Sequence, residues 1–350
     1  MGTPHRILSQ DELNRALIER QMLRERADLG AFATIERLFG IQAQEPKSPY
    51  IGLWTRLENF RAEELEDLLV SRHAVRILLM RGTIHLVSAQ DALALRPLTQ
   101  IKLDRELQSG PFASRLRGLD LDAVAEAGRK ILEDTPQGTA DAGKRLLERW
   151  PDREHTVLGN ALRNKLALVQ LPPRGLWHRS GRAVCTTLEA WLDQEQHPMS
   201  LETLVLRYLK AFGPATVMDA QQWSGLTRLA ETFEALRPQL VTFGNEAGKE
   251  LFDLPDAPRP DPGTPVPVRL LPEFDNILLA HADRRRVIAD DRLGVVVGGK
   301  PTVLVDGYVV ATWSITKDST ITVDYLDSLP PSRQKAVAEE CDRLQDWIRT

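Results

Sequence analysis

The sequence has few of the residues that cross-link a protein or anchor it in a membrane. Its two cysteines, Cys185 and Cys341, lie too far apart for a Cys-x-x-Cys motif or a metal knuckle, so we expect reduced, partly buried thiols. No uncharged apolar run approaches the roughly 18 residues of a membrane span. Residues 1–8 contain no hydrophobic signal core. We therefore expect a cytoplasmic protein with no membrane partner.

Most familiar catalytic motifs are also missing. The sequence contains no GxSxG elbow, no Walker A lysine, no GxGxxG after a strand and no HExxH. Its seven histidines show no spacing typical of metal ligands. A zinc, phosphoryl-transfer or acyl-transfer enzyme is therefore disfavoured, and we expect no metal and no cofactor.

The composition is that of a folded protein with an uneven charge distribution. Apolar residues make up 42% and charged residues 27% of 350 residues, which indicates two or more packed subdomains. The net charge of -4 disfavours a nucleic-acid partner on average. Residues 141–182, however, carry nine basic and four acidic side chains, whereas residues 231–261 carry three basic and seven acidic ones. This polarisation allows a basic groove.

The hydrophobic periodicity predicts mostly helix up to about residue 240. Ser9, followed three residues later by Glu12, is typical of a helix start. Three helices followed by short strands occur three times. In the first repeat one predicted helix begins at residue 9 and the others are 31–39 and 61–73. In the second repeat the predicted helices are 121–134, 139–150 and 155–168. In the third they are 200–212, 215–223 and 226–236. The predicted strands are 75–80 and 83–87, then 169–177, then 241–243 and 250–254. This order predicts three tandem winged-helix units, at residues 1–115, 116–195 and 196–255.

The remaining segment, 256–350, favours strands. Residues 256–267 hold five prolines and are expected to be a linker. The strands predicted beyond it are 267–271, 285–288, 294–297, 301–305, 308–315 and 320–325. Such a series suggests a small β-barrel, with an amphipathic closing helix at 330–348. The predicted fold class is thus mostly α with a C-terminal β part.

One loop carries a polar pair with a spacing suited to catalysis. Gln42 and Gln44 follow a helix that we expect to end at Gly40. In an extended backbone, residues two apart point to the same side. Two amides can donate to and accept from one water and so orient it without ionising. On spacing alone, ordinary polar decoration of a loop is the alternative.

Four motifs in order along the chain resemble the AlkZ/YcaQ-type winged-helix DNA glycosylases. They are residues 38–44 (LFGIQAQ), 81–87 (RGTIHLV), 270–284 (LLPEFDNILLAHADR) and 301–307 (PTVLVDG). The resemblance implies three winged helices and a β-barrel. It also implies a monofunctional glycosylase that releases alkylated purines, including bulky adducts and interstrand cross-links, from double-stranded DNA. Gln42 and Gln44 match the two-glutamine, AlkZ-like form of the signature and are the expected catalytic residues.

The expected DNA contacts come from three places. The segment with His281, Arg284, Arg285 and Arg286, read as a hairpin between two strands, is the candidate for the minor groove, with about two arginines reaching DNA. A solvated basic turn is its alternative.

Two further groups of residues are candidates. Arg81, Thr83 and His85 lie on the first predicted wing, and His85, alternating with apolar neighbours, is expected to face away from the core. Its alternative is a surface histidine without a role. Arg163 and Lys165 end a helix and are expected to bind phosphate or merely to decorate that helix end.

Other conspicuous side chains are expected to be structural. Asp275 and Asp306 are read first as turn and capping residues. Five tryptophans are expected to anchor the core or subdomain interfaces: Trp54, Trp177, Trp191, Trp223 and Trp313.

Two other functions fit the sequence. A winged-helix regulator would bind DNA without catalysis and usually dimerises, whereas this chain shows no heptad-rich dimer helix and is expected to be a monomer. A lesion-shielding protein would bind damaged DNA and release no base. The favoured interpretation is a nucleoid-associated glycosylase.

Overall fold

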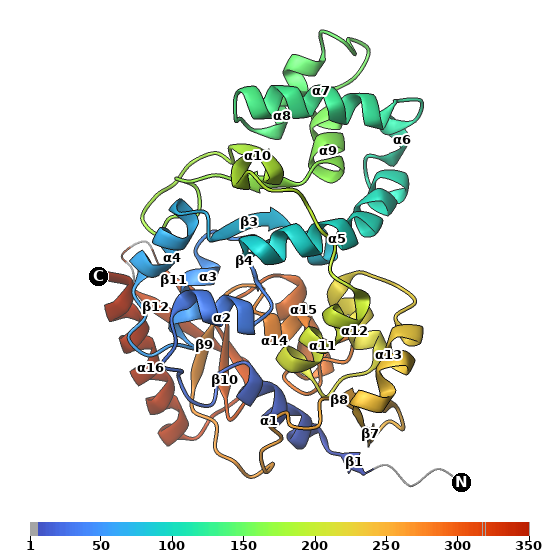
Figure 1. Cartoon of the computed structure of the whole chain (residues 1–350). Coiled ribbons are helices and arrows are strands. Elements are labelled where there is room, and N and C mark those ends of the chain that lie inside the picture. The colour runs from blue at the N-terminus through green and yellow to red at the C-terminus, as the bar shows by residue number, and fades with distance from the viewer. Residues whose placement is uncertain (1–5, 317, 319, 350) are drawn as a thin grey trace.

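The computed structural model describes residues 6–316, 318 and 320–349 (Figure 1). The expectation about the N-terminus rests partly on residues 1–5, which lie outside the described residues. Within the described part of the chain, no helix is both long and apolar enough to span a membrane. Cys185 and Cys341 are free and buried, as predicted.

The first segment alternates helices and short strands. Ser9 and Glu12 form the predicted capping box at the start of α1. Three sequence-predicted helices are present with shifted ends. The elements are β1 (Ile7–Leu8), α1 (Gln10–Arg20), α2 (Ala31–Arg37), β2 (Ile41–Gln42), α3 (Ser48–Trp54), α4 (Ala62–Val70), β3 (Ala74–Leu78), η1 (Met80–Gly82), β4 (Ile84–Ser88) and α5 (Ala89–Ser109).

The second segment forms the upper lobe in Figure 1. Its elements are α6 (Ala113–Leu116), α7 (Leu121–Asp134), α8 (Thr139–Leu146), α9 (His155–Lys165), β5 (Leu168–Gln170), β6 (Cys185–Thr187) and α10 (Leu188–Leu192). Strand β5 pairs antiparallel with both β6 and β3, so one five-stranded sheet, β2-β4-β3-β5-β6, joins the first two segments. The predicted wing at 169–177 is therefore replaced by the pair of β5 and β6, whose second strand begins only at Cys185.

The third segment repeats the order of helices and paired strands. Its elements are α11 (Leu201–Phe212), α12 (Val217–Ser224), α13 (Ala230–Leu236), η2 (Arg237–Gln239), β7 (Val241–Asn245) and β8 (Glu250–Asp253). Strand β7 lies between β1 and β8 in a three-stranded sheet. Each segment thus contains the three predicted helices followed by strands, with β2 and α3 added in the first and a different strand pair in the second, while the assignment as winged helices stays a prediction.

The C-terminal segment corrects the predicted barrel. Among the described residues its strands form one open four-stranded antiparallel sheet, β12-β11-β10-β9. Two predicted strands are absent, because residues 285–288 form turns and residues 294–297 lie in a helix. The elements are β9 (Arg269–Leu271), α14 (Asn276–Leu279), η3 (Asp290–Arg292), α15 (Leu293–Val297), β10 (Thr302–Val305), β11 (Tyr308–Ile315), β12 (Ile321–Tyr325) and α16 (Pro331–Arg349).

The closing helix α16 packs against the open four-stranded sheet. Its buried side chains Val337, Cys341 and Leu344 share a hydrophobic cluster with residues of β9, β10 and β11. Four of the five tryptophans expected in the core are buried, and Trp191 is partly buried against it.

The two aspartates have the structural roles predicted for them. Asp275 caps α14 by accepting from Ile277 N, and Asp306 lies in the turn between β10 and β11 at a φ of 52°.

Candidate active site

Strand β2, which contains Gln42 and precedes Gln44, is an edge strand of the five-stranded sheet. Gly40 precedes it at a φ of 91°, and a Cβ there would lie 2.7 Å from Val87 Cγ1, so this turn requires glycine. Gln42 pairs with His85 of β4, and Ala43 N donates to Ile84 O at 2.8 Å. The backbone is therefore extended up to Gln42 and stays hydrogen-bonded to β4 at Ala43, while Gln44 lies in a bend, so the extended backbone assumed for the pair ends before Gln44.

Arg81 holds the Gln42 side chain in one orientation. Arg81 Nη2 donates to Gln42 Oε1 at 2.8 Å, and its Nη1 donates to Trp223 O at 3.0 Å. A guanidinium only donates, so the atom facing it is the amide oxygen. The Gln42 amide nitrogen has no hydrogen bond among the described residues and is not one of their fully buried unpaired polar atoms. Gln42 thus presents a hydrogen-bond donor to solvent.

His85 completes this arrangement and corrects the sequence interpretation. It was expected to face away from the core, but it is only 1% exposed, because its strand lies inside the sheet between β2 and β3. His85 Nδ1 lies 3.0 Å from Thr83 O, which requires a proton on Nδ1, and Nε2 then accepts from Arg81 Nη2 at 3.2 Å. Burial, followed by the charge of Arg81, lowers the pKa of His85 to about 3. His85 is therefore neutral at physiological pH.

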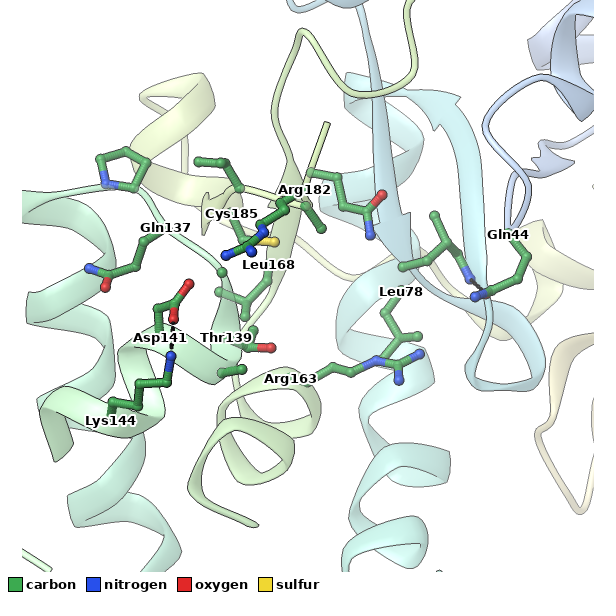
Figure 2. A pocket seen from close by; sticks show the side chains of 17 residues that line it. Gln44, Leu78, Gln137, Thr139, Asp141, Lys144, Arg163, Leu168, Arg182 and Cys185 are labelled. Atoms are coloured by element: carbon green, nitrogen blue, oxygen red, sulfur yellow. Dashed lines mark hydrogen bonds and ion pairs between the residues drawn. The ribbon is translucent and has the colours of Figure 1, made fainter. Parts of the chain in front are cut away.

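Gln44 reaches the surface beside a large pocket. Its side chain is exposed, and Ile84 N donates to Gln44 Oε1 at 3.4 Å. The pocket has a volume of about 660 Å³ and is lined by Gln44, by residues of the sheet and by α8 and α9 (Figure 2). Gln42 and Gln44 therefore differ in role: one is buried and held by a cation, and the other is open to a ligand.

Two side chains that the sequence analysis missed hold the backbone of the motif. Arg76 Nη2 donates to Ala43 O at 2.8 Å, and Asn276 Nδ2 donates to Gly40 O at 2.7 Å. Burial, followed by the nearby charge of Arg174, lowers the pKa of Arg76 to about 10. A lone arginine inside the apolar run 74–80 was the available signal for Arg76. Asn276 lies 236 residues from its partner, and no local pattern indicates it.

The residues expected in the minor groove divide into buried and exposed groups. His281 and Arg286 are 1% and 4% exposed and are hydrogen-bonded to Phe212 O and Pro214 O, so the structure gives them internal roles. The segment is a loop and not a hairpin. Arg285 is exposed and paired with Asp283, whereas Arg284 is half-buried and is close enough to lower the pKa of Arg81.

The other predicted DNA contacts also differ among themselves. Thr83 is partly buried, with its hydroxyl donating to Met80 O. Lys165 forms an ion pair with Asp122 at 2.7 Å. Arg163 is exposed, lines the pocket beside Gln44, and has no ion pair or hydrogen bond within the described residues. In the part of the chain that the structure describes, no group of three or more His, Cys, Asp or Glu could hold a metal ion.

Comparisons with known proteins identify a family and a fold for the chain. Residues 35–347 match the family model described as DNA glycosylase AlkZ-like. A curated relative, the interstrand DNA cross-link repair glycosylase of Streptomyces sahachiroi, is 24% identical over 89% of each chain. The solved structure of the DNA glycosylase AlkZ from the same organism superposes with a TM-score of 0.79 at 23% identity, covering 98% of each chain. The matched range includes the glutamine pair and Arg81.

Proposed function

The chain belongs to the AlkZ-like DNA glycosylase family, and from this premise we propose that it hydrolyses the N-glycosidic bond of alkylated purines in duplex DNA. The finer substrate class is bulky N7-alkylguanine adducts or interstrand cross-links, the latter being what its curated relative is named for. The product is an abasic site. Gln42 and Gln44 are the proposed catalytic residues.

The observation that carries this proposal is the fixed orientation of Gln42. With Oε1 bound by Arg81, the Gln42 amide nitrogen donates to the oxygen of a water molecule. Gln44 Oε1 accepts one hydrogen of the same water. The second lone pair of the water then points at C1′ of the target nucleotide. Arg81 and His85 are positioning residues in this arrangement, since they act only through Gln42.

The chemistry requires little of the protein beyond position. An N7-alkylated guanine is cationic, so when the bond from C1′ to N9 breaks, its electron pair neutralises the base. The water oxygen bonds to C1′ of the oxocarbenium-like sugar, and its proton passes to solvent. Oriented amide dipoles are suited to that transition state, and removing one should cost about 2–4 kcal/mol of barrier.

Three tandem winged helices would enclose the duplex, and the protein would act as a monomer. Arg284, Arg285, Arg163 and Lys165 remain the proposed DNA contacts, because their side chains are at least partly exposed. His281 and Arg286 are buried and do not join them.

The test is release of the base from duplex DNA containing 7-methylguanine or a bulky N7-alkylguanine, measured under single-turnover conditions. We expect Gln42→Ala and Gln44→Ala each to slow release about 30- to 1000-fold at saturating enzyme. Gln90→Ala, which removes an exposed amide on α5, is the matched control and should retain the wild-type rate.

Two results would contradict the proposal. Unchanged release by a Gln42→Ala, Gln44→Ala double variant would place the active site elsewhere. DNA binding without release of any base from either substrate would favour the regulator or the lesion-shielding protein.

A further inference from the structure

The pocket beside Gln44 contains two arginines that form no ion pair among the described residues. Arg163 comes from α9 and Arg182 from the loop between β5 and β6. Both are exposed, and neither has an ion pair or hydrogen bond within the described residues. Figure 2 shows them between Gln44 on one side of the pocket and Asp141 on the other.

The neighbouring charges do not supply a partner. Asp141 is the only acidic residue of the lining, and it is already paired with Lys144 at 2.7 Å. Lys165, two residues beyond Arg163, has its own partner in Asp122. The pocket lining therefore carries three basic side chains against one acidic one, an excess of positive charge.

The rest of the lining favours a ligand that is larger than a free anion. Leu78, Leu168 and Val184 form an apolar wall, and the volume of about 660 Å³ far exceeds that of a phosphate. Helix α8 begins in the same wall after Gly138, which offers no side chain to cap it, while Asp141 N donates to Gly138 O. The N–H groups of Thr139 and Ala140 add to the positive potential. Apolar and cationic groups together fit a sugar–phosphate backbone.

We propose that Arg163 and Arg182 bind a backbone phosphate of the DNA strand beside the nucleotide that Gln44 faces. The proposal rests on the proposed function and extends it, because it places one strand relative to the glutamine pair. Guanidinium groups bind phosphate oxygens through paired, charge-assisted hydrogen bonds. The apolar wall contacts the adjoining deoxyribose. This contact fixes the register of the strand and hence the position of the target sugar over Gln44.

Binding of full-length protein to a short duplex with one central abasic-site analogue tests this without requiring catalysis. Fluorescence anisotropy over a range of NaCl concentrations gives the affinity and its salt slope. We expect the Arg163→Gln, Arg182→Gln double variant to bind at least about tenfold more weakly. Its salt slope should fall by about one, the value for one lost phosphate contact. Arg333→Gln, which removes an exposed charge from α16, should change neither quantity.

Phosphate ethylation identifies the contact itself. In the wild type, ethylating one phosphate next to the abasic analogue should weaken binding, and in the double variant that interference should vanish. Wild-type affinity, slope and interference in the double variant would overturn the proposal. So would competition by inorganic phosphate at constant ionic strength with no ethylation effect, since the site would then hold a free anion.

Failure of this inference can be told apart from failure of the proposed function. If the interference pattern appears but no base is ever released, the strand contact stands and the glycosylase mechanism falls. If Gln42 and Gln44 are required for release but no flanking phosphate interferes, the mechanism stands and the pocket has another role.

Discussion

At the scale of single residues, the two glutamines are chemically unequal. Arg81 binds the oxygen of the Gln42 amide and so turns its nitrogen toward a ligand, whereas the oxygen of exposed Gln44 keeps a free lone pair beside its contact with Ile84 N. Substitution by glutamate, which has no donor when ionised, should therefore affect the two positions differently.

We expect Gln42→Glu to be as inactive as Gln42→Ala, although a carboxylate would keep the contact with Arg81. Gln44→Glu should keep most of the activity, because it preserves the acceptor and adds a base. Single-turnover release of 7-methylguanine measures both variants. The opposite ranking would mean that Gln42 acts as the acceptor.

The same argument extends to Arg81. Arg81→Met frees the Gln42 amide to rotate, and should slow base release without weakening binding of an abasic-analogue duplex. In the Arg81→Met, Gln42→Ala double variant we expect no further loss beyond Gln42→Ala. Additive losses would show that Arg81 acts independently of Gln42.

Buried histidines should make the protein sensitive to acid. Burial, followed by nearby arginines, lowers the pKa of both His85 and His281 to about 3. Between a pH of about 6.5 and about 3 the unfolded chain therefore binds protons that the native protein does not. Stability falls as pH falls through this window, by up to about 1.4 kcal/mol per pH unit for each histidine.

Urea denaturation at pH 7.5 and pH 5.0 measures this loss. His281→Gln should reduce the difference in unfolding free energy between the two pH values by about 2 kcal/mol, following the same linkage. His197→Gln, at an exposed histidine, should leave the difference unchanged. An equal loss in wild type and His281→Gln would show that the native state protonates His281 easily.

At the scale of elements, local signals predicted much of the fold. The capping box of Ser9 and the whole of α7 (Leu121–Asp134) appear as expected, because caps and amphipathic periodicity are encoded within one element. Helix α5 was missed because it is buried around much of its circumference and contains Pro97, so it lacks a clear polar face.

The wrongly predicted strand and the unpredicted contact of Gln42 share a cause, because both depend on residues elsewhere in the chain. Residues 294–297 are rich in valine and were predicted as a strand, yet they form part of α15, because strand formation depends on a neighbouring strand with which to pair. The glutamine pair was singled out by its spacing, and its catalytic role was inferred from the family resemblance. Its contact with Arg81 spans 39 residues and could not be predicted from local pattern.

The close packing of α8 on α9 gives a prediction at this scale. A Cβ on Gly143 would lie 2.1 Å from His155 O and 3.1 Å from Gly159 N, both backbone atoms that cannot rotate away. Alanine usually stabilises a helix by about 1 kcal/mol relative to glycine. We expect Gly143→Ala instead to destabilise the protein by about 1–3 kcal/mol.

Thermal and urea denaturation check this expectation. Gly294→Ala is the matched control, because a Cβ there meets nothing within 4 Å, and it should not destabilise the protein. Equal stabilisation by both substitutions would mean that α8 and α9 can separate without cost. The distance between α8 and α9 also affects the shape of the pocket beside Gln44, since both helices line it.

At the scale of the whole molecule, the hydrophobic core consists of separate clusters of different sizes. The cluster that includes Leu162 draws only on residues 107–185, whereas the two larger clusters each combine residues of the first and C-terminal segments. The division into four consecutive domains stays a prediction. The core supports one lobe within residues 107–185, attached to a body formed by the remaining segments through strand β5 and through Ala167, Val169 and Leu171, which belong to a body cluster.

This lobe should open as its own cooperative unit, which amide hydrogen exchange measures. Leu162 is fully buried, and Leu162→Ala should cost about 2–5 kcal/mol. We expect faster exchange throughout α7–α9 and unchanged exchange in α11 and α16. Leu344→Ala, at a fully buried residue of α16, should have the reverse pattern. Uniformly faster exchange in both variants would show a single cooperative core.

Duplex DNA should suppress the opening of this lobe. The proposed phosphate contact uses Arg163 and Arg182 of the lobe, while Gln42 and Gln44 belong to the body, so one bound strand bridges the two. A ligand that binds only the closed arrangement lowers the open population by a factor of one plus the ratio of free ligand concentration to Kd. We therefore expect an abasic-analogue duplex to slow exchange in α7–α9 of the wild type, and to do so less in the Arg163→Gln, Arg182→Gln variant at equal saturation. Equal protection in both would mean that the strand binds the body alone, and that the register of the target sugar is set without the lobe.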